Sequence, residues 1–509
     1  NVFPVPDGDT GTNMYLTLQA AWEEIASLTE DSISVISQGI AHGALMGARG
    51  NSGVILSQLF RGMAQALENL DVMDAPAFAT ALQQASQTAY KAVIRPVEGT
   101  ILTVARGVAD AARAAVESLA DIKEVLAEIV RAARAAVADT PSQLPVLAEA
   151  GVVDAGGQGL YVILEGMLRY LRGETILSEA ALEADMAFVH PVGPEAGYGY
   201  DVQFVVQGED LDVEMIRAAI DAMGESTLVV GDSRAVKVHV HTPEPGTPLN
   251  YGASLGSLSR IIVENMQEQY EAFVGAEQHA RAAPAAARRP ATGIAIVAVV
   301  PGAGLAKVYE SLGTAAIVSG GQTMNPSTED LLNAIQELDN PQIIILPNNK
   351  NVILTAQQAQ KLCEREVRVV PSKTVPQGIS ALLAFNYQAD LDANVQAMER
   401  ALEEIHTGEV TRAVRSVRFD GLEVEEGQFI GLLDGKLVTA GDDLDRVVLQ
   451  LIEMMEPAEL EILTLFYGED VTEEEAQALA EVISGRYPDH EVEVIDGGQP
   501  HYPYILSGE

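Results

Sequence analysis

The sequence has little of what would build disulfides, thiolate metal centres or membrane spans. Cys363 is the single cysteine, which excludes an internal disulfide and any site that needs several thiolates. No apolar run approaches the ~20 residues that a transmembrane helix needs, and no signal peptide is visible. We therefore expect a cytoplasmic protein.

Basic residues are also scarce. Lysine and arginine number 31 against 73 acidic residues, which gives a formal net charge of -42. Such a surface repels polyanions, so nucleic acid is not an expected partner. The same charge suits a protein that meets a basic partner or holds divalent cations, although solubility alone also explains it.

The hydrophobic period changes along the chain. Its 509 residues are too many for one core. An Ala- and Leu-rich part with apolar residues at helical spacing is followed by β-type runs, and then by strands that alternate with helices. The predicted domains are a helical domain at 1–180, a small α+β domain at 187–275, an Ala-, Pro- and Arg-rich linker at 276–292, and an α/β region at 293–509 with two lobes split near 390–415.

The stretch "PDGDTGTNM" near the start places Asp7 and Asp9 on either side of one glycine. Two carboxylates at this spacing can converge on a hard cation, and the glycine allows the tight turn. The hydroxyl and amide residues that follow can donate to phosphate oxygens at the start of a helix. Magnesium with a nucleotide phosphate is one interpretation, and an acidic turn that caps a helix is the other.

A second stretch, "GARGNSGVILSQ", places three glycines around Asn51 and Ser52 just before an apolar helical run. Backbone amides bared by glycine at a helix N-terminus form a cradle for anions. The stretch is not a Walker A motif, because it has no Gly-Lys-Ser/Thr. Close packing of helices through small residues is the alternative.

Two further glycine-bearing loops, "RPVEGTIL" and "GVVDAGGQGL", interrupt the helical pattern. They carry Glu98, Thr100 and Asp154. Four polar loops of this kind in one helical domain are hard to explain by packing alone. We therefore expect the breaks between the helices to carry the chemistry.

These loops resemble the DAK2 domain, the nucleotide-binding DhaL-type helical domain of dihydroxyacetone kinases. The motifs "VKVHVHT" and "SGGQTMNPSTEDLL" resemble one subgroup, the fatty acid kinase A proteins. The resemblance runs from residue 1 to the C-terminus. It implies a multidomain chain with an all-α helical barrel of eight helices, a small α+β middle domain and a two-lobed α/β C-terminal region. It also implies ATP and two Mg²⁺ ions as cofactors.

The resemblance also assigns roles to residues. It implies that the principal Mg²⁺ ligands are Asp7 and Asp9, and Asn1 is the polar residue nearest to the family's third aspartate. The phosphate side falls on Thr10, Gly11, Thr12, Asn13, Asn51, Ser52 and Gly53, with Arg49 as an extra phosphate ligand. The adenine side falls on Thr100, Ile101, Asp154, Ala155 and Gly156, where "DAG" replaces the kinases' Asp-Pro-Gly.

The acceptor implied for this subgroup is a fatty acid carboxylate held by a separate DegV-like carrier protein, and the product is an acyl phosphate. The carrier is expected to dock on the C-terminal region, and the chain is expected to form a homodimer. A carboxylate is already ionised at neutral pH, so no strong general base is required.

Two other functions remain open. A ketose kinase of the dihydroxyacetone type would trap its substrate through a histidine, and His406 in "LEEIHTGEV", which we predict to be a helix end, lies in the middle of the C-terminal region. A scaffold that binds nucleotide without transferring phosphate is the third hypothesis. Transfer of phosphate to a carrier-bound fatty acid, with dihydroxyacetone tested in parallel, would separate the three.

A histidine pair in "AVKVHVHT" is a candidate zinc site. His239 and His241 are two apart on a predicted strand, so both side chains project from one face. The resemblance places a further ligand, a cysteine in the family, at Asp201. A histidine pair that hydrogen-bonds a partner is the alternative.

Loops after predicted strands of the C-terminal region form another candidate surface, because α/β folds build sites there. Ordinary turn chemistry explains each residue equally well when taken alone. The residues are Gly320, Gly321, Asn325, Asn348, Asn349 and Lys373.

Overall fold

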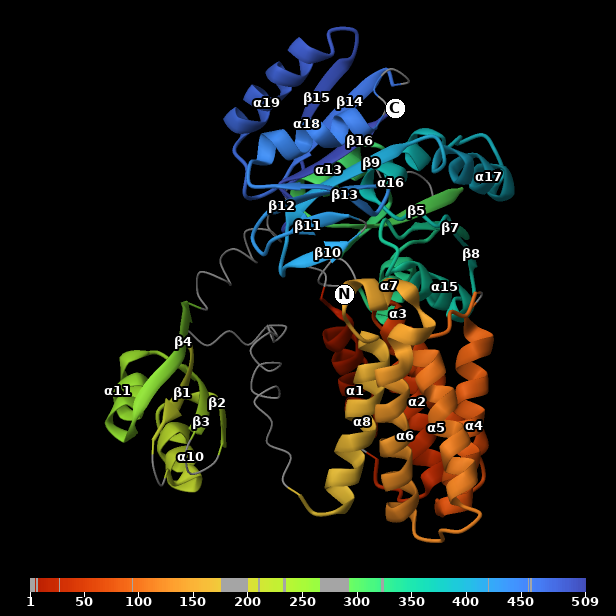
Figure 1. Cartoon of the computed structure of the whole chain (residues 1–509), viewed down its shortest axis with the longest axis vertical. Coiled ribbons are helices and arrows are strands. Elements are labelled where there is room, and N and C mark those ends of the chain that lie inside the picture. The colour runs from red at the N-terminus through yellow and green to blue at the C-terminus, as the bar shows by residue number, and fades with distance from the viewer. Residues whose placement is uncertain are drawn as a thin grey trace. The chain divides into compact units, whose positions relative to one another are not determined.

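The computed structural model divides the chain into two compact units. One unit comprises Asn1–Glu174 with Ala291–Glu509, and the other comprises Thr175–Pro290. Figure 1 shows the elements of both units along the chain. The structure describes residues 5, 8–26, 28–93, 95–174, 200–208, 211–231, 235–265, 293–321, 325–419, 421–455, 457 and 460–509.

The N-terminal part of the first unit is all helical, with its long helices side by side in the red to yellow part of Figure 1. The apolar faces of these helices pack together into one core that includes Phe78, Leu102 and Ile129. The helices are α1 (Thr10–Ala26), α2 (Ile33–Met46), α3 (Gly50–Ala66), α4 (Ala75–Ala92), α5 (Ile101–Ala115), α6 (Ile122–Gln143), α7 (Pro145–Ala150) and α8 (Ala155–Leu171).

Side-chain caps fix where several of these helices begin. Asp74, Thr100, Asp121 and Asp154 each accept a hydrogen bond from a backbone N–H in the first turn of α4, α5, α6 and α8, respectively. Asp, Ser, Thr and Asn are favoured at this position because they satisfy an N–H group that has no partner within the helix. The polar residues that interrupt the helical pattern therefore set the helix boundaries.

The second unit contains a four-stranded antiparallel sheet in the order β2-β3-β1-β4. Alternate residues of the central strands, such as Val202, Phe204 and Val238, are buried in its core. Its elements are β1 (Tyr200–Gln207), α10 (Val213–Asp221), β2 (Glu225–Gly231), β3 (Ala235–Thr242), α11 (Gly246–Leu255) and β4 (Ser257–Asn265).

The C-terminal part of the first unit begins with a parallel sheet in the order β6-β5-β7-β8. Its central strands are almost continuously apolar, as expected for strands that are covered on both faces. The elements are β5 (Ile294–Val300), α13 (Ala303–Ser311), β6 (Ala316–Ser319), α14 (Thr328–Gln336), β7 (Gln342–Leu346), α15 (Ile353–Leu362), β8 (Glu366–Val369), α16 (Val375–Leu383) and α17 (Leu391–Ala401).

A second, mixed sheet follows in the order β13-β12-β9-β16-β14-β15. Only β14 and β15 are parallel, with α19 between them in the chain. The elements of this lobe are β9 (His406–Arg412), β10 (Val417–Phe419), β11 (Leu422–Val424), β12 (Phe429–Leu433), β13 (Lys436–Gly441), α18 (Leu444–Met454), β14 (Ile462–Tyr467), α19 (Glu473–Arg486), β15 (Glu491–Asp496) and β16 (Tyr504–Gly508). Strands β10 and β11 pair with each other in a separate two-stranded sheet.

The helical part and the C-terminal part of the first unit pack directly on each other. Met46 of α2 packs against the core of the parallel sheet, and Val5 packs into an apolar cluster of the second lobe. Helix α3 contacts α15, and α7 contacts β10. The helical domain is therefore covered at one end by the C-terminal region.

The predicted multidomain architecture, with an N-terminal helical domain and a C-terminal α/β region, is confirmed. His406 is not a helix end, because α17 stops at Ala401 and His406 opens strand β9, where it pairs with Gly508. None of the helices that the structure describes combines the length and the apolarity that a membrane-spanning helix needs.

Candidate functional site

A cavity of ≈ 400 Å³ lies at the end of the helical domain that the C-terminal region covers. The first turns or capping residues of α1, α3, α5 and α8 all line it, so four helix N-termini converge on one space. Each N-terminus carries N–H groups without a partner in the helix and a partial positive charge. The arrangement favours a ligand with negative charge, such as a phosphate chain.

All four glycine-bearing loops of the sequence contribute to this cavity. The predicted residues that line it are Asp9, Thr10, Asn13, Asn51, Ser52, Thr100, Ile101, Asp154, Ala155 and Gly156. These loops are far apart in sequence, and they meet because the helices between them run alongside each other. The structure brings these side chains together around one cavity, and their roles as ligands of a nucleotide stay a prediction.

Asp9 is the carboxylate at the centre of this end of the cavity. Its side chain is 7% exposed, and its Oδ2 atom accepts a hydrogen bond of 2.9 Å from the Nδ2 atom of Asn13, one helical turn further on. The side-chain amide of Asn325, from the C-terminal region, donates to the same oxygen. Two amide donors thus hold the Asp9 carboxylate in place, and carboxylate oxygens are common ligands of Mg²⁺.

Helix α3 begins with an unusual backbone conformation. Gly50 has φ +56°, and a Cβ atom there would lie 2.5 Å from Nδ2 of Asn13. Only glycine adopts this conformation without strain. The glycine therefore lets the α3 N-terminus, with Asn51 and Ser52, approach Asp9 and Asn13 closely.

The opposite side of the cavity is less polar. Ile101, Ala155 and Gly156 lie beside Asp154, which caps α8 by accepting a 2.7 Å hydrogen bond from the Gly157 N–H group. Burial raises the pKa of the Asp154 carboxyl, and the Gly157 hydrogen bond opposes that shift. Apolar surface beside a few polar groups suits a flat aromatic base.

Glu98 supports the loop on this side. Its carboxylate accepts two hydrogen bonds from Arg106, at 2.8 and 2.7 Å, and further ones from Thr103 and Tyr90. The hydrogen bonds from Arg106 and Thr103 lower the pKa of the Glu98 carboxyl. The loop that contributes Val97 and Thr100 to the cavity is thereby fixed to α5.

Some predicted residues lie elsewhere. Gly11 and Thr12 are exposed on α1, and Gly53 abuts Thr17, where a Cβ atom would lie 2.4 Å from the Thr17 hydroxyl oxygen. These three do not line the cavity. The predicted ligands Asp7 and Asn1 lie outside the described residues.

Arg49 turns toward the C-terminal region. Its Nη1 atom donates to the backbone oxygen of Asn325 at 2.9 Å and lies 3.4 Å from a carboxylate oxygen of Asp330. Arg49 does not line the cavity itself. Its observed contacts therefore join the two parts of the unit next to the candidate phosphate site.

Part of the cavity lining comes from the C-terminal region and was not predicted from the sequence. Asn351 and Leu354 line the cavity, and Asn51 Nδ2 donates weakly to Asn351 Oδ1 at 3.4 Å. Arg95 also lines the cavity. No local signal marks Asn351 and Leu354, since they reach the site only through packing of α15 on α3.

The donor set at Asp9 fits a magnesium ion. Near the Asp9 carboxylate, the buried side-chain oxygens of Asn325 and Asn51 find no hydrogen-bond donor among the described residues. Carboxylate and amide oxygens are ligands of Mg²⁺. The residues present are therefore compatible with a divalent cation beside a phosphate chain.

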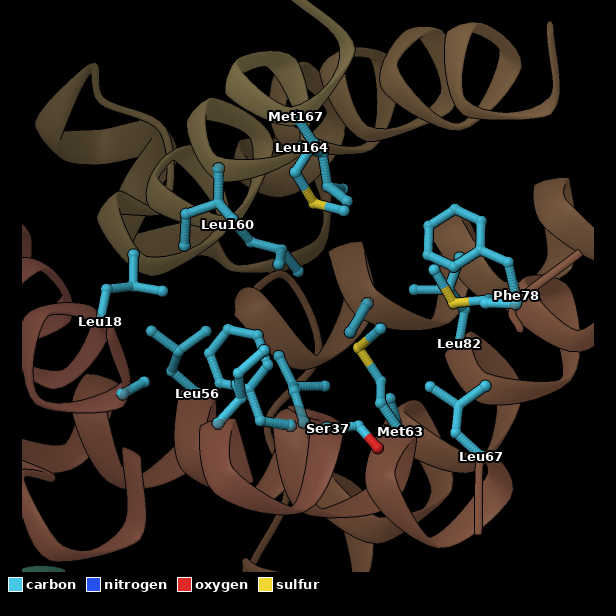
Figure 2. Close-up of a pocket in the computed structure, with 18 of the residues that line it drawn as sticks. Leu18, Ser37, Leu56, Met63, Leu67, Phe78, Leu82, Leu160, Leu164 and Met167 are labelled. Carbon is cyan, nitrogen blue, oxygen red and sulfur yellow. The ribbon is translucent and has the colours of Figure 1, made fainter. Parts of the chain in front are cut away.

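A second cavity, of ≈ 390 Å³, lies inside the helical domain and is almost wholly apolar (Figure 2). Leucines of α1, α3 and α8 and Phe78 of α4 line it, and Ser37 supplies the single hydroxyl. That hydroxyl already donates to the backbone oxygen of Ser34. This cavity lacks the polar groups that would hold a nucleotide.

The candidate zinc residues occupy neighbouring strands. Asp201 pairs with His241 across β1 and β3, and His239 pairs with Gln203. Their side chains lie outside what the structure describes, and no group of three His, Cys, Asp or Glu gathers among the described residues. The structure gives no support for zinc, which stays a prediction.

The predicted surface of the C-terminal loops is divided. Gly320, Gly321, Asn348 and Asn349 line a cleft of ≈ 30 Å³ between the two lobes. Lys373 is exposed outside it, and Asn325 faces Asp9 instead. A cleft of this size holds about one water molecule.

The helical arrangement and its loops define a DAK2-type domain joined to an α/β region. Family models match in three places: the DAK2 domain at residues 4–169, the middle domain of FakA-like fatty acid kinase subunits at 197–273, and the C-terminal domain of the same subunits at 295–509. The chain belongs to this family of FakA-like fatty acid kinase subunits.

Relatives cover the whole chain. The protein YloV of Bacillus subtilis is 40% identical over 524 residues, which span 100% of this chain and 94% of YloV. An uncharacterized protein of Staphylococcus epidermidis is 41% identical over 521 residues, with the same coverage of 100% and 94%.

Solved structures resemble the chain more distantly. The dihydroxyacetone kinase of C. freundii in complex with AMP-PNP and Mg²⁺ has a TM-score of 0.32 and 13% identity, over 58% of this chain and 55% of that one. DegV, a fatty acid binding protein from Bacillus subtilis, has a TM-score of 0.33 and 12% identity, over 42% of this chain and 99% of that one.

Proposed function

We propose that this chain is the ATP-binding catalytic component of a two-component fatty acid kinase. It transfers the γ-phosphoryl group of Mg-ATP to the carboxylate of a fatty acid held by a separate carrier protein, and the product is an acyl phosphate. The observation that carries the proposal is the convergence of four helix N-termini on one cavity beside the Asp9 carboxylate. Family membership supports the choice of a fatty acid as acceptor.

The nucleotide's phosphates lie, in this proposal, along the N-termini of α1 and α3. Thr10, Asn13, Asn51 and Ser52 donate hydrogen bonds to them, and the helix dipoles favour their charge. Asp9 holds the divalent cation, together with Asp7. The bound cation neutralises phosphate charge, which is the main requirement of phosphoryl transfer.

The base of the nucleotide lies on the less polar part of the cavity, against Ile101, Ala155 and Gly156. The caps at Thr100 and Asp154 hold the starts of α5 and α8 in place, so the cavity is shaped before the nucleotide enters. Positioning of this kind contributes to rate because the reacting groups lose little freedom in the reaction step.

The acceptor's chemistry explains why the site needs no strong base. A fatty acid carboxylate is ionised at neutral pH and can attack phosphorus without losing a proton. Among the described residues that line the cavity there is no histidine. The second component is a DegV-like fatty-acid-binding carrier that docks on the C-terminal region, and the ATP-binding component works as a homodimer.

The test is transfer of labelled γ-phosphate from Mg-ATP to a long-chain fatty acid offered on a bacterial fatty-acid-binding carrier, with dihydroxyacetone in a parallel reaction. We expect carrier-dependent label in an acyl phosphate. Asp9→Asn should abolish it. Asp110→Asn makes the same chemical change on an exposed face of α5, with a side chain 62% exposed, and should not affect transfer.

Two results would contradict the proposal. Label in dihydroxyacetone phosphate alone would make the chain a ketose kinase. Nucleotide binding with no label in either acceptor would favour a scaffold that binds ATP without transferring phosphate.

A further inference from the structure

A segment of the C-terminal region reaches the candidate cation site. Asn325 lies just before α14 and is 1% exposed. Its side-chain amide donates to the Asp9 carboxylate, although the two residues are 316 positions apart in sequence. The same carboxylate oxygen accepts from Asn13 at 2.9 Å.

Several contacts hold this segment in place. Arg49 and Ser327 form an isolated antiparallel bridge, and the Thr328 N–H group donates to the Ala48 oxygen at 3.2 Å. Arg49 also donates to the Asn325 backbone oxygen at 2.9 Å and pairs with Asp330 at 3.4 Å. These contacts from Ala48 and Arg49 therefore hold Asn325 beside Asp9.

The side-chain oxygen of Asn325 has no hydrogen-bond donor among the described residues, although it is fully buried. Buried acceptors nearly always have a partner, so an acceptor of this kind beside a carboxylate points to a ligand that binds there. The nitrogen of the same side-chain amide donates to the Asp9 carboxylate, so the unpartnered oxygen lies close to that carboxylate.

We infer that Asn325 joins Asp9 as an oxygen ligand of the divalent cation that accompanies the nucleotide. The inference rests on the proposed nucleotide-binding function of this cavity. It makes the metal site a joint product of the helical domain and the C-terminal region. The helical domain supplies the carboxylate, and the C-terminal region supplies a neutral amide oxygen.

The experiment measures Mn²⁺ binding by electron paramagnetic resonance in the presence of ADP, with the full-length chain. Mn²⁺ takes the same oxygen ligands as Mg²⁺. Asn325→Ala should weaken Mn²⁺ binding by at least about tenfold, as losses around metal sites commonly do. Asn325→Asp keeps an oxygen ligand and loses the amide donor, so it should retain Mn²⁺ binding. ADP binding measured in EDTA should be the same in all three proteins.

Asn394→Ala is the matched control, because Asn394 is also 1% exposed but its side-chain amide bonds only to backbone groups of its own neighbourhood, through both its nitrogen and its oxygen. It should not change Mn²⁺ binding. Equal weakening in Asn394→Ala would show that packing of the C-terminal region, not a ligand, controls the metal, and would overturn the inference.

Three further results would overturn it. Unchanged binding in Asn325→Ala would show that the amide does not touch the metal. Tighter binding would show that the amide competes with the cation for Asp9. Loss of binding in both Asn325→Ala and Asn325→Asp would show that the amide acts as a donor that orients Asp9. None of these measurements includes an acceptor, so failure of fatty acid phosphorylation leaves the result interpretable.

Discussion

Replacement of Gly50 by alanine tests the close approach at the start of α3. Gly50 has φ +56°, and an L-residue in this conformation costs about 1–2 kcal/mol. The added Cβ atom would also lie 2.5 Å from Nδ2 of Asn13. Asn13 is 3% exposed, so its amide cannot move aside without losing its hydrogen bond to Asp9.

A hydrogen bond lost from a buried group costs about 1–3 kcal/mol. Together the two terms predict that Gly50→Ala lowers the free energy of unfolding by about 2–5 kcal/mol. Gly151→Ala separates them, since Gly151 has φ +64° but an added Cβ atom meets nothing within 4 Å. Gly151→Ala should lower the free energy of unfolding only by the conformational part, about 1–2 kcal/mol.

The assay is differential scanning calorimetry of both variants and the unmodified protein, followed by titration with Mg-ADP. The extra 1–3 kcal/mol in Gly50→Ala corresponds to a midpoint roughly 2–12 °C below that of Gly151→Ala for a domain of this size. Gly50→Ala should also weaken Mg-ADP binding, whereas Gly151→Ala should not. Equal midpoints for the two variants would refute the reasoning about Asn13.

Other predictions concern charge, capping and metal content. The folded-state pKa of Glu98 is lowered from its ordinary 4.5, so its contribution to stability is present above pH 4.5 and is lost as the pH falls through the lower folded-state value. Glu98→Gln should therefore lose less stability on acidification than the unmodified protein, and parallel slopes in pH-dependent thermal melts would contradict this. Asp154→Ala should cost about 0.5–2 kcal/mol through loss of the α8 cap, while Asp154→Asn, which keeps an acceptor oxygen, should cost less; equal costs in urea unfolding would argue against a capping role. Metal analysis of the purified protein, with His239→Ala as control, tests the zinc prediction, and absence of zinc from both proteins would remove it.

Local sequence is sufficient to predict the helical half of the site. Glycine and small polar residues interrupt apolar helical runs where helices start, so Asp9, Asn51, Thr100 and Asp154 can be identified as a set. The same reasoning fails for Gly11 and Thr12, because helical geometry turns them to the exposed face of α1. The sequence shows which residues occupy the start of a helix. Whether their side chains face the cavity or the solvent depends on how the neighbouring helices pack.

The C-terminal half of the site cannot be predicted from local patterns. Asn325 follows a predicted strand, which assigns it to the surface at the strand ends, whereas in the structure it contacts Asp9. The mistake at His406 has the same origin, since its strand is defined by pairing with Gly508 at the other end of the region. A contact between residues far apart in sequence leaves no periodic signal in either segment.

The cavity is built by two stretches of chain, Asn1–Glu174 and Ala291–Glu509, and a whole compact unit separates them in sequence. The residues that line the cavity come from both of these stretches. Two separately expressed chains carrying these stretches should reassemble the cavity, with affinity reduced by loss of the effective concentration that a tether supplies, commonly in the mM range. The site therefore resembles an interface between two protein chains, although both of its halves belong to one polypeptide.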